Sequence, residues 1–192
     1  MKKHFYAVMS RMKNIYRWGL MRNTRRENLS EHSLEVAQIA HALAIIGNKR
    51  FGKNYDACYT ATVAMYHDSS EIITGDMPTP IKYYNDEIKE AYKQIEAAAE
   101  KQLTEMLPDD FKQDFHKIYN PDEETKRLVK AADKLSALIK CIEELNMGNR
   151  EFCVAEKTIR KALGEIDLPE VQVFLDEFIP SFALSLDEQG RI

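Results

Sequence analysis

The chain has 192 residues, of which 44% are hydrophobic and 30% charged, with a net charge of −4. These values are ordinary for one soluble globular domain, and seven glycines with six prolines are too few for the many turns of an all-β fold. The three cysteines form no C-x-x-C pair and lie in apolar contexts, which favours reduced, buried thiols and a cytoplasmic protein over disulfides or a zinc knuckle. No segment has the apolar length of a signal peptide core or a membrane span, so no membrane partner is expected.

The start of the chain is basic: residues 1–26 carry eight Lys and Arg and no Asp or Glu. A transit peptide would have this composition. However, Trp18, Leu20 and Met21 lead directly into the helix expected to carry His32, so cleavage would damage the domain. The basic segment is then either a solvated face or a positive patch that faces an anionic substrate.

Apolar residues at helical spacing predict helices along the whole chain, so the expected fold is all-α, compact and single-domain. We expect the first helix over residues 1–17, stopped by Gly19, and the second from Glu31 to Ile46, with Ser30 as N-cap and Gly47 as stop. The remaining predicted helices cover Asp56 to Ile73–Gly75, 88–106, 109–119, 122–146, 151–163 and a segment opened by Pro169.

The segment from Ala61 to Pro80 concentrates polar side chains of the kind that bind metals. His67 and Asp68 are adjacent, and Glu71 follows four residues after His67, on the same face if one helix continues through all three. Asp76 lies in the following proline-containing loop. An imidazole beside a carboxylate near a helix end makes half of a divalent-metal site.

Two further candidates lie in other predicted helices, His32 upstream and Asp133 downstream. Helical periodicity places Asp133 beside an apolar stripe, where an unpaired carboxylate is costly. Asp133 could instead form an ion pair with Arg127 or Lys130 on its own helix, and His32 could be a surface residue.

Three segments carry a resemblance to a known family: RWGLMRNTRRENLSEHS, AMYHDSSEIITGDMPTPIKY and VKAADKLSALIKCIEEL. With the order H…HD…D they resemble the bacterial HD-domain 5'-deoxynucleotidases of the YfbR type, over nearly the whole chain to the closing IPSFALSLDE. The resemblance implies a single HD domain over residues 1–192, with the metal-binding core at about 28–147 and the C-terminal helices 150–180 packing on it.

The resemblance also implies roles for individual residues. The implied metal ligands are His32, His67, Asp68 and Asp133. Arg17 would orient the phosphate, Trp18 would select deoxyribose, and Glu71 and Asp76 would be catalytic or substrate-contacting. The implied substrate-binding set is Arg17, Trp18, His32, Asp68, Asp76, Met77, Pro78, Thr79 and Asp133. By this resemblance the protein would be a cytoplasmic homodimer that works best with cobalt and also uses manganese or copper.

The residue types suit this chemistry. Two imidazoles and two carboxylates favour Co²⁺, Mn²⁺ or Zn²⁺. Arg17 can donate two parallel hydrogen bonds to phosphate, and Trp18 can block a 2'-hydroxyl, although a surface arginine and a core tryptophan are alternatives. Glu71 can protonate the leaving oxygen unless it is only a helix-surface residue, and Asp76 can bind the sugar, position a water or cap the loop.

The expected function is metal-dependent hydrolysis of deoxyribonucleoside 5'-monophosphates, selective against ribonucleotides and broad in base. No histidine lies between His67 and His116, which favours one metal over two, and Ile72 after Glu71 counts against an alarmone hydrolase. The alternatives are an HD-type nucleoside tri- or oligophosphate hydrolase and a non-catalytic helical module whose basic arm binds nucleic acid. The acidic balance of the chain disfavours a nucleic-acid partner.

Overall fold

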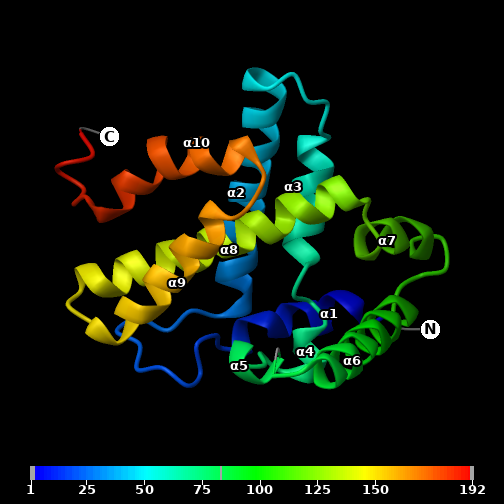
Figure 1. Cartoon of the computed structure of the whole chain (residues 1–192). Coiled ribbons are helices and arrows are strands. Elements are labelled where there is room, and N and C mark those ends of the chain that lie inside the picture. The colour runs from blue at the N-terminus through cyan, green and yellow to red at the C-terminus, as the bar shows by residue number, and fades with distance from the viewer. Residues whose placement is uncertain (1–2, 83, 191–192) are drawn as a thin grey trace.

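Helices form nearly all regular structure in the computed structural model, which describes residues 3–82 and 84–190 (Figure 1). Within these residues the only β-type pairing is an isolated antiparallel bridge between Tyr16 and Asn28, so the all-α prediction is confirmed. The α-helices are α1 (Phe5–Met9), α2 (Leu29–Arg50), α3 (Ala57–Tyr66), α4 (Glu71–Thr74), α5 (Thr79–Lys82), α6 (Asp86–Glu105), α7 (Lys112–Tyr119), α8 (Glu123–Asn146), α9 (Cys153–Gly164) and α10 (Pro169–Glu177). Short 3-10 helices cover Ser10–Asn14, Arg150–Phe152 and Ile179–Ala183.

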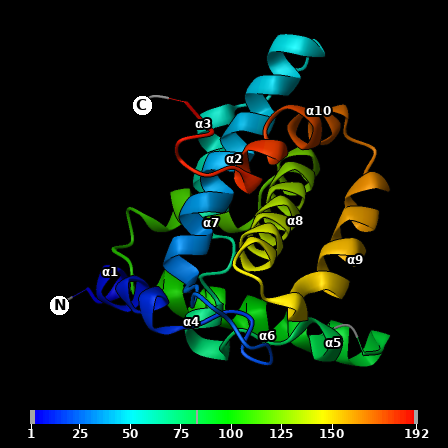
Figure 2. The ribbon, with the colours of Figure 1, turned by 90° about the vertical axis from the view of Figure 1, so that its left-hand side faces the viewer.

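The main apolar core lies where α2, α3 and α8 pack on one another. Its buried residues include Val36 and Leu43 of α2, Val63 of α3, and Leu135 and Ile139 of α8. Helix α9 packs on α8 and α10 packs on α2, so the C-terminal helices lie against this three-helix centre (Figures 1 and 2).

A second, smaller apolar cluster joins α1, α6 and α7. It consists of Phe5, Leu103, Leu107 and Phe115, with Tyr66 of α3 packed against it. The 67–70 turn and α4 lead from the end of α3 toward α6, which contacts α4 (Figure 1). This turn therefore connects the main core to the smaller cluster.

The N-terminal helix is shorter than predicted. Residues 5–9 are α-helical and residues 10–14 form a 3-10 helix, after which Ile15 is extended. The prediction that the helix continues to residue 17 and stops at Gly19 was wrong, because the chain pairs with the segment before α2: Ile15 accepts a hydrogen bond from the Leu29 N–H at 3.0 Å.

Helix α2 is longer than predicted at both ends. It begins after Asn28, whose side chain caps it in a reciprocal arrangement with Glu31, so the assignment of Ser30 as N-cap was wrong. Gly47 stays inside the helix instead of stopping it. A Cβ atom at Gly47 would lie 2.5 Å from the Tyr55 ring and 2.7 Å from a Glu170 oxygen, so the missing side chain serves close packing.

The predicted helix from Asp56 to Ile73–Gly75 is divided in two. Helix α3 ends at Tyr66, turns occupy residues 67–70, and α4 begins at Glu71. His67 and Glu71 therefore do not share one continuous helix face, contrary to the prediction. In the described residues, no helix combines the length and the hydropathy that crossing a bilayer requires.

Candidate metal centre

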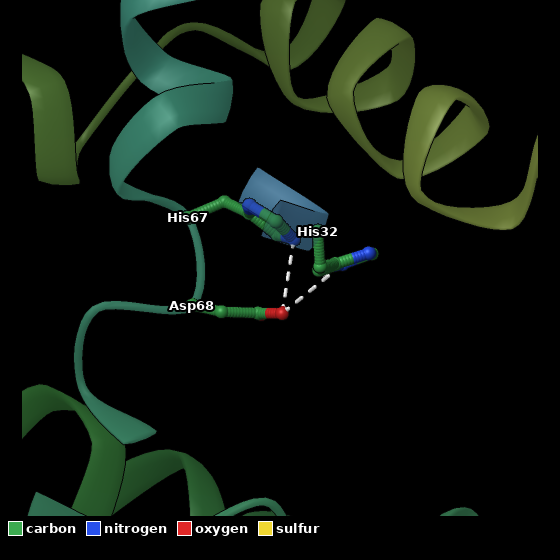
Figure 3. Close-up of side chains that lie close together, drawn as sticks. All are labelled: His32, His67 and Asp68. Atoms are coloured by element: carbon green, nitrogen blue, oxygen red, sulfur yellow. Dashed lines mark ion pairs between the residues drawn. The ribbon is translucent and has the colours of Figure 1, made fainter. Parts of the chain in front are cut away.

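Three separate segments bring the predicted ligands together. His32 lies in the first turns of α2, His67 and Asp68 in the turn after α3, and Asp133 within α8. The Asp68 Oδ2 atom lies 3.4 Å from His32 Nε2 and 3.1 Å from His67 Nε2 (Figure 3). Asp133 Oδ1 lies 3.2 Å from His32 Nε2, and this contact replaces the ion pair with Arg127 or Lys130 that the sequence left open.

The donor set fits a divalent metal ion. Ligand atoms of His32, His67 and Asp68 all lie within 4.8 Å of one another. The Nε2 atoms of both histidines are buried and, among the described residues, have no hydrogen-bond partner. Buried polar nitrogens without partners are costly, and coordination to a shared ion would satisfy both. Asp133, whose side chain is 41% exposed, lies at the open side of this group.

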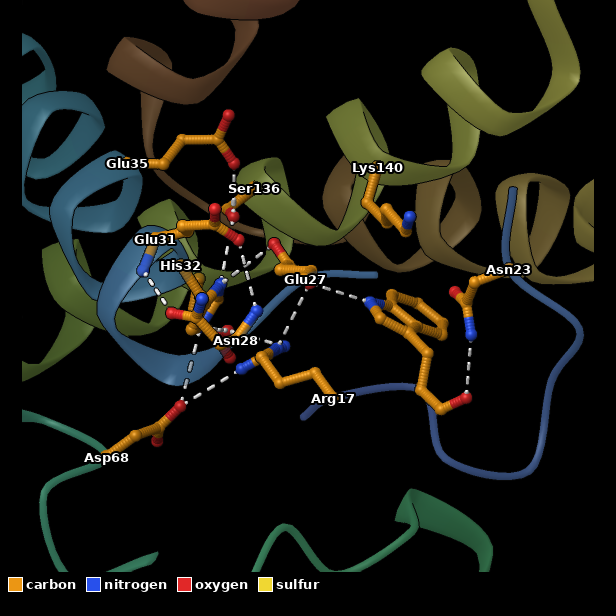
Figure 4. Close-up of polar contacts among 12 residues, drawn as sticks. Arg17, Asn23, Glu27, Asn28, Glu31, His32, Glu35, Asp68, Ser136 and Lys140 are labelled. Atoms are coloured by element: carbon orange, nitrogen blue, oxygen red, sulfur yellow. Dashed lines mark hydrogen bonds and ion pairs between the residues drawn. The ribbon is translucent and has the colours of Figure 1, made fainter. Parts of the chain in front are cut away.

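The outer nitrogen of each histidine is held by a fixed partner. His67 Nδ1 lies 2.7 Å from the Ala64 carbonyl, which can only accept, so Nδ1 donates and Nε2 is the nitrogen that faces the centre. His32 Nδ1 lies 3.1 Å from the Ser136 hydroxyl, which donates to Glu35 at 2.5 Å (Figure 4). Both histidines thus direct Nε2 toward the centre, where each can bind a metal ion that displaces any proton from it.

The carboxylate of Asp68 is ionised. Burial alone would raise its pKa, but His67 and His32 lower the pKa of Asp68 well below its ordinary value. Burial opposes the charged form of His67, whereas Asp68 raises the pKa of His67 to about 9. The carboxylates beside His67 therefore favour a positive charge at this position. A metal cation can take the place of the proton that His67 binds.

Arg17 reaches this centre from the segment before α2. Its Nη1 donates to Asp68 Oδ2 at 3.0 Å, and its Nη2 lies 3.8 Å from Asp133 Oδ1. The side chain is only 14% exposed, so Arg17 is not the surface arginine that the sequence left as an alternative. Burial would lower the pKa of Arg17, but Asp68 and Asp133 raise it, so the guanidinium stays charged.

Trp18 is half-buried beside Arg17 and has a left-handed backbone, with φ of 59°. For a bulky residue this conformation is strained and needs support from its surroundings. Its indole lies against Phe152, with ring centroids 5.4 Å apart, and its Nε1–H donates to Glu27 at 3.0 Å.

Glu71 opens α4 and is buried, and its Oε2 atom has no hydrogen-bond partner among the described residues. Burial, with the neighbouring charges of Asp68 and Asp76, raises the pKa of Glu71 to about 9. The alternative of a helix-surface glutamate is therefore wrong.

Asp76 lies in the loop between α4 and α5. Burial raises the pKa of Asp76 above its ordinary value, although Arg17 and the backbone N–H of Trp18 act to lower it. Because both groups act on Asp76, the loop lies near the Arg17–Trp18 pair. Met77 and Pro78 are half-buried in the same loop, and the side chain of Thr79 lies outside the described residues.

Sequence reasoning missed three side chains that hold the predicted residues: Glu27, Glu35 and Ser136. Glu27 had one available signal, since it is the first acidic residue after an acid-free stretch of 26 and directly precedes the Asn28 cap. Glu35 and Ser136 lie 101 residues apart, and nothing local marks their contact.

The chain is similar to one known family and to proteins and structures of known kind. The model of the family described as 5'-deoxynucleotidase YfbR-like matches residues 4–182. A 5'-deoxynucleotidase of Vibrio vulnificus (strain YJ016) is 53% identical over 190 residues, which cover 97% of this chain and 98% of that protein. A 5'-deoxynucleotidase of Yersinia pestis (strain Pestoides F) is 53% identical over 188 residues, covering 96% and 95% of the two chains.

Solved structures share the fold. An HD-domain phosphohydrolase from Listeria innocua superposes with a TM-score of 0.82 at 23% identity, over 98% of this chain and 93% of that one. A cyanophage S-2L HD phosphohydrolase, described as bound to dA and one catalytic Zn²⁺ ion, has a TM-score of 0.63 at 20% identity, over 91% and 96% of the chains. At these identities the likeness concerns the fold.

Proposed function

This chain belongs to the 5'-deoxynucleotidase YfbR-like family, and from that membership we propose that it hydrolyses deoxyribonucleoside 5'-monophosphates to deoxynucleosides and phosphate. The reaction depends on one divalent metal ion, discriminates against ribonucleotides and accepts different bases. The observation that carries the proposal is the convergence of His32, His67, Asp68 and Asp133 from three segments, with Arg17 beside them.

The metal proposal rests on the two buried, partnerless histidine nitrogens and the two carboxylates around them. Bound by these four side chains, a divalent ion would polarise a phosphoryl oxygen and supply a water of lowered pKa. Co²⁺ is favoured, and Mn²⁺, Cu²⁺ and Zn²⁺ also suit two nitrogen and two oxygen donors.

Arg17 is proposed to bind and orient the phosphate. Its planar guanidinium can donate two parallel hydrogen bonds, and it lies against the same carboxylates that would bind the metal ion. A phosphate that reaches the metal centre therefore meets a charged fork already held in place by Asp68 and Asp133.

Trp18 is proposed to exclude the ribose 2'-hydroxyl. The indole is half-buried against Phe152, so it presents a rigid wall beside Arg17. A 2'-hydroxyl placed against this wall would clash and lose its hydrogen bonds to water, which penalises ribonucleotides.

Glu71 is proposed to give a proton to the departing 5'-oxygen, directly or through water. Its burial and raised pKa keep the carboxyl protonated at neutral pH, as a general acid requires. Asp76, with Met77, Pro78 and Thr79, is proposed to border the nucleoside from the loop between α4 and α5.

We also propose that the enzyme is a cytoplasmic homodimer. The cytoplasmic part is supported by the three free cysteines, of which Cys141 is buried and Cys153 half-buried, whereas Cys58 is exposed, contrary to the prediction of three buried thiols. Size-exclusion chromatography with light scattering measures the assembly directly, and a monomeric mass would contradict the dimer.

Phosphate release by cobalt-loaded protein from dAMP, dTMP and AMP tests the function. We expect release from both deoxynucleotides, much less from AMP, and loss of turnover after chelator treatment. Comparable release from AMP would contradict the selectivity, and full turnover after chelation would contradict metal dependence. Release of pyrophosphate or tripolyphosphate from deoxynucleoside triphosphates would instead identify an oligophosphate hydrolase.

A further inference from the structure

Glu27 occupies a position between the residues proposed to read the phosphate and the sugar. Its backbone carbonyl accepts a hydrogen bond from the Arg17 N–H at 3.0 Å, next to the Tyr16–Asn28 bridge. The segment that carries Arg17 and Trp18 is thereby paired with the segment that enters α2. This pairing places the Glu27 side chain, which is 13% exposed, directly against both residues.

One carboxylate oxygen of Glu27 contacts both side chains. The Trp18 Nε1–H donates to Glu27 Oε2 at 3.0 Å. Arg17 Nε lies 3.5 Å from the same oxygen, and Figure 4 shows Arg17 and Glu27 side by side. The other oxygen, Oε1, lies 3.9 Å from His32 Nδ1. A single side chain thus links the indole, the guanidinium and the outer face of a proposed metal ligand.

The indole depends on this contact for its position. Trp18 has a strained left-handed backbone, so its neighbours must over-determine its conformation. Phe152 packs against the indole at a tilted angle, and Glu27 fixes the ring edge through the only polar atom of the indole. Without an acceptor at Glu27, the buried N–H would have to find water or another partner, and the ring would be free to shift.

The space behind Glu27 makes such a shift feasible. A cavity of about 150 Å³ adjoins Glu27 and is lined by charged side chains, among them Glu31, Glu35 and Lys140. Removal of the Glu27 carboxylate would enlarge this polar cavity toward the indole and admit water.

We propose that Glu27 is the positioning residue for sugar selectivity, holding the Trp18 indole and the Arg17 guanidinium at a fixed separation so that a bound phosphate brings the sugar against the indole. The inference rests on the proposed function and deepens it, because a steric test for one hydroxyl group requires a wall that does not move. Glu27 itself touches no reacting atom in this scheme and acts through Arg17 and Trp18.

The test compares Glu27→Ala and Glu27→Gln with the matched control Glu31→Gln, which removes one charge four residues away but keeps an oxygen that can accept from the Asn28 backbone N–H. In metal-loaded protein, kcat and KM are measured for dAMP and AMP. Trp18 is the only tryptophan, so its emission and its quenching by acrylamide report the indole directly.

For Glu27→Ala we expect the dAMP-to-AMP ratio of kcat/KM to fall about tenfold, as for loss of one hydrogen bond. Emission should shift to longer wavelength with stronger quenching. Glu27→Gln, whose amide oxygen still accepts from the indole, should retain most of the ratio, and Glu31→Gln all of it. In a Trp18→Phe background, Glu27→Ala should leave the ratio unchanged, because the group that Glu27 positions is gone.

A Glu27→Ala enzyme with an unshifted emission and a ratio within about twofold of wild type would overturn the positioning role. Failure of the wild-type protein to release phosphate from dAMP would contradict the proposed function itself. The wild-type assay tests that function, and the comparison of Glu27→Ala with wild type tests the positioning role.

Discussion

Single buried side chains set the chemistry of the candidate centre. The partnerless Nε2 atoms of His32 and His67 and the ionised Asp68 favour a cation, whereas Glu71 is a buried carboxyl whose raised pKa keeps it neutral. The two acids lie three residues apart and differ in environment, since Asp68 contacts two histidines and Arg17, while for Glu71 burial and the charges of Asp68 and Asp76 outweigh those of Lys82 and Arg17. Metal binding and proton donation are therefore expected to be separable by substitution.

We expect Glu71→Gln to keep the metal ion and lose turnover, and Asp68→Asn to lose both. The amide of Glu71→Gln cannot give a proton, so kcat should fall by a factor of about 10²–10⁴. Elemental analysis of dialysed protein, with phosphate release from dAMP, measures the two effects. A Glu71→Gln enzyme with wild-type kcat, or stoichiometric metal in Asp68→Asn, would contradict the assignment.

At the scale of elements, the irregular segment between residues 15 and 28 carries Arg17 and Trp18 and is anchored by Glu144 of α8. Glu144 is buried and accepts hydrogen bonds from the Thr24 backbone N–H at 2.9 Å, the Thr24 hydroxyl at 2.7 Å, Lys140 at 2.5 Å and Asn149 at 2.7 Å. Contacts with α8 thus fix the middle of this segment, while the Tyr16–Asn28 bridge pairs its two ends.

This anchor predicts a pH-dependent stability. Burial opposes ionisation of Glu144, but Lys140, Asn149 and Thr24 lower its pKa to about 2. Because the folded pKa lies below the ordinary value, the contribution is fully present above pH of about 4.5 and is lost as the pH falls toward about 2. We expect Glu144→Gln to cost about 2–3 kcal/mol at pH 7 and much less at pH 3.

Urea unfolding at both pH values measures this difference. Glu143→Gln, an exposed neighbour on the same helix, is the matched control and should change the free energy of unfolding little at either pH. Equal destabilisation by Glu144→Gln at pH 7 and pH 3 would exclude the ionised carboxylate as its source.

The loop after α4 depends on Gly75, which has φ of 75° and ψ of 161°, a region open essentially to glycine alone. We expect Gly75→Ala to destabilise the fold by about 1–3 kcal/mol and to weaken binding of nucleotide by moving Asp76. Gly164→Ala, at the end of α9 with open space for a Cβ, should be neutral or slightly stabilising. Thermal unfolding of both variants, with KM for dAMP, decides the matter; equal melting temperatures would contradict the strain argument.

Across the whole molecule, the centre lies where the main core of α2, α3 and α8 meets the smaller cluster of α1, α6 and α7. The 67–70 turn bridges the two, and Arg17 connects the N-terminal segment to Asp68 and Asp133. The turn that carries His67 and Asp68 is thus joined to the main core at one end and leads toward the smaller cluster at the other.

One cooperative unit is therefore expected. Leu135→Ala in the main core and Leu103→Ala in the smaller cluster each remove a fully buried side chain and should cost about 2–5 kcal/mol. Both should lower the midpoint of the same single transition, followed by circular dichroism and by Trp18 emission. Two separated transitions, with Leu103→Ala affecting one of them alone, would show that the clusters unfold independently.

The sequence alone was sufficient for the fold class, the order of most helices and the candidate ligands. Apolar periodicity along α6 and α8 depends on local spacing, and the caps of α3 and α8 at Asp56 and Asp122 lie within a few residues of the helices they start. His32, His67, Asp68 and Asp133 were identified by residue type and by resemblance, without any knowledge of their contacts.

Only the tertiary structure decided where helices break and which side chains support the centre. The turn at residues 67–70, the left-handed backbone of Trp18, and the roles of Glu27, Glu144 and Ser136 all involve contacts with other segments. Residues up to 120 positions apart meet in these contacts. Local propensity extends over a few residues, whereas burial and hydrogen bonding between segments fix the conformation at these positions, so local patterns do not determine it.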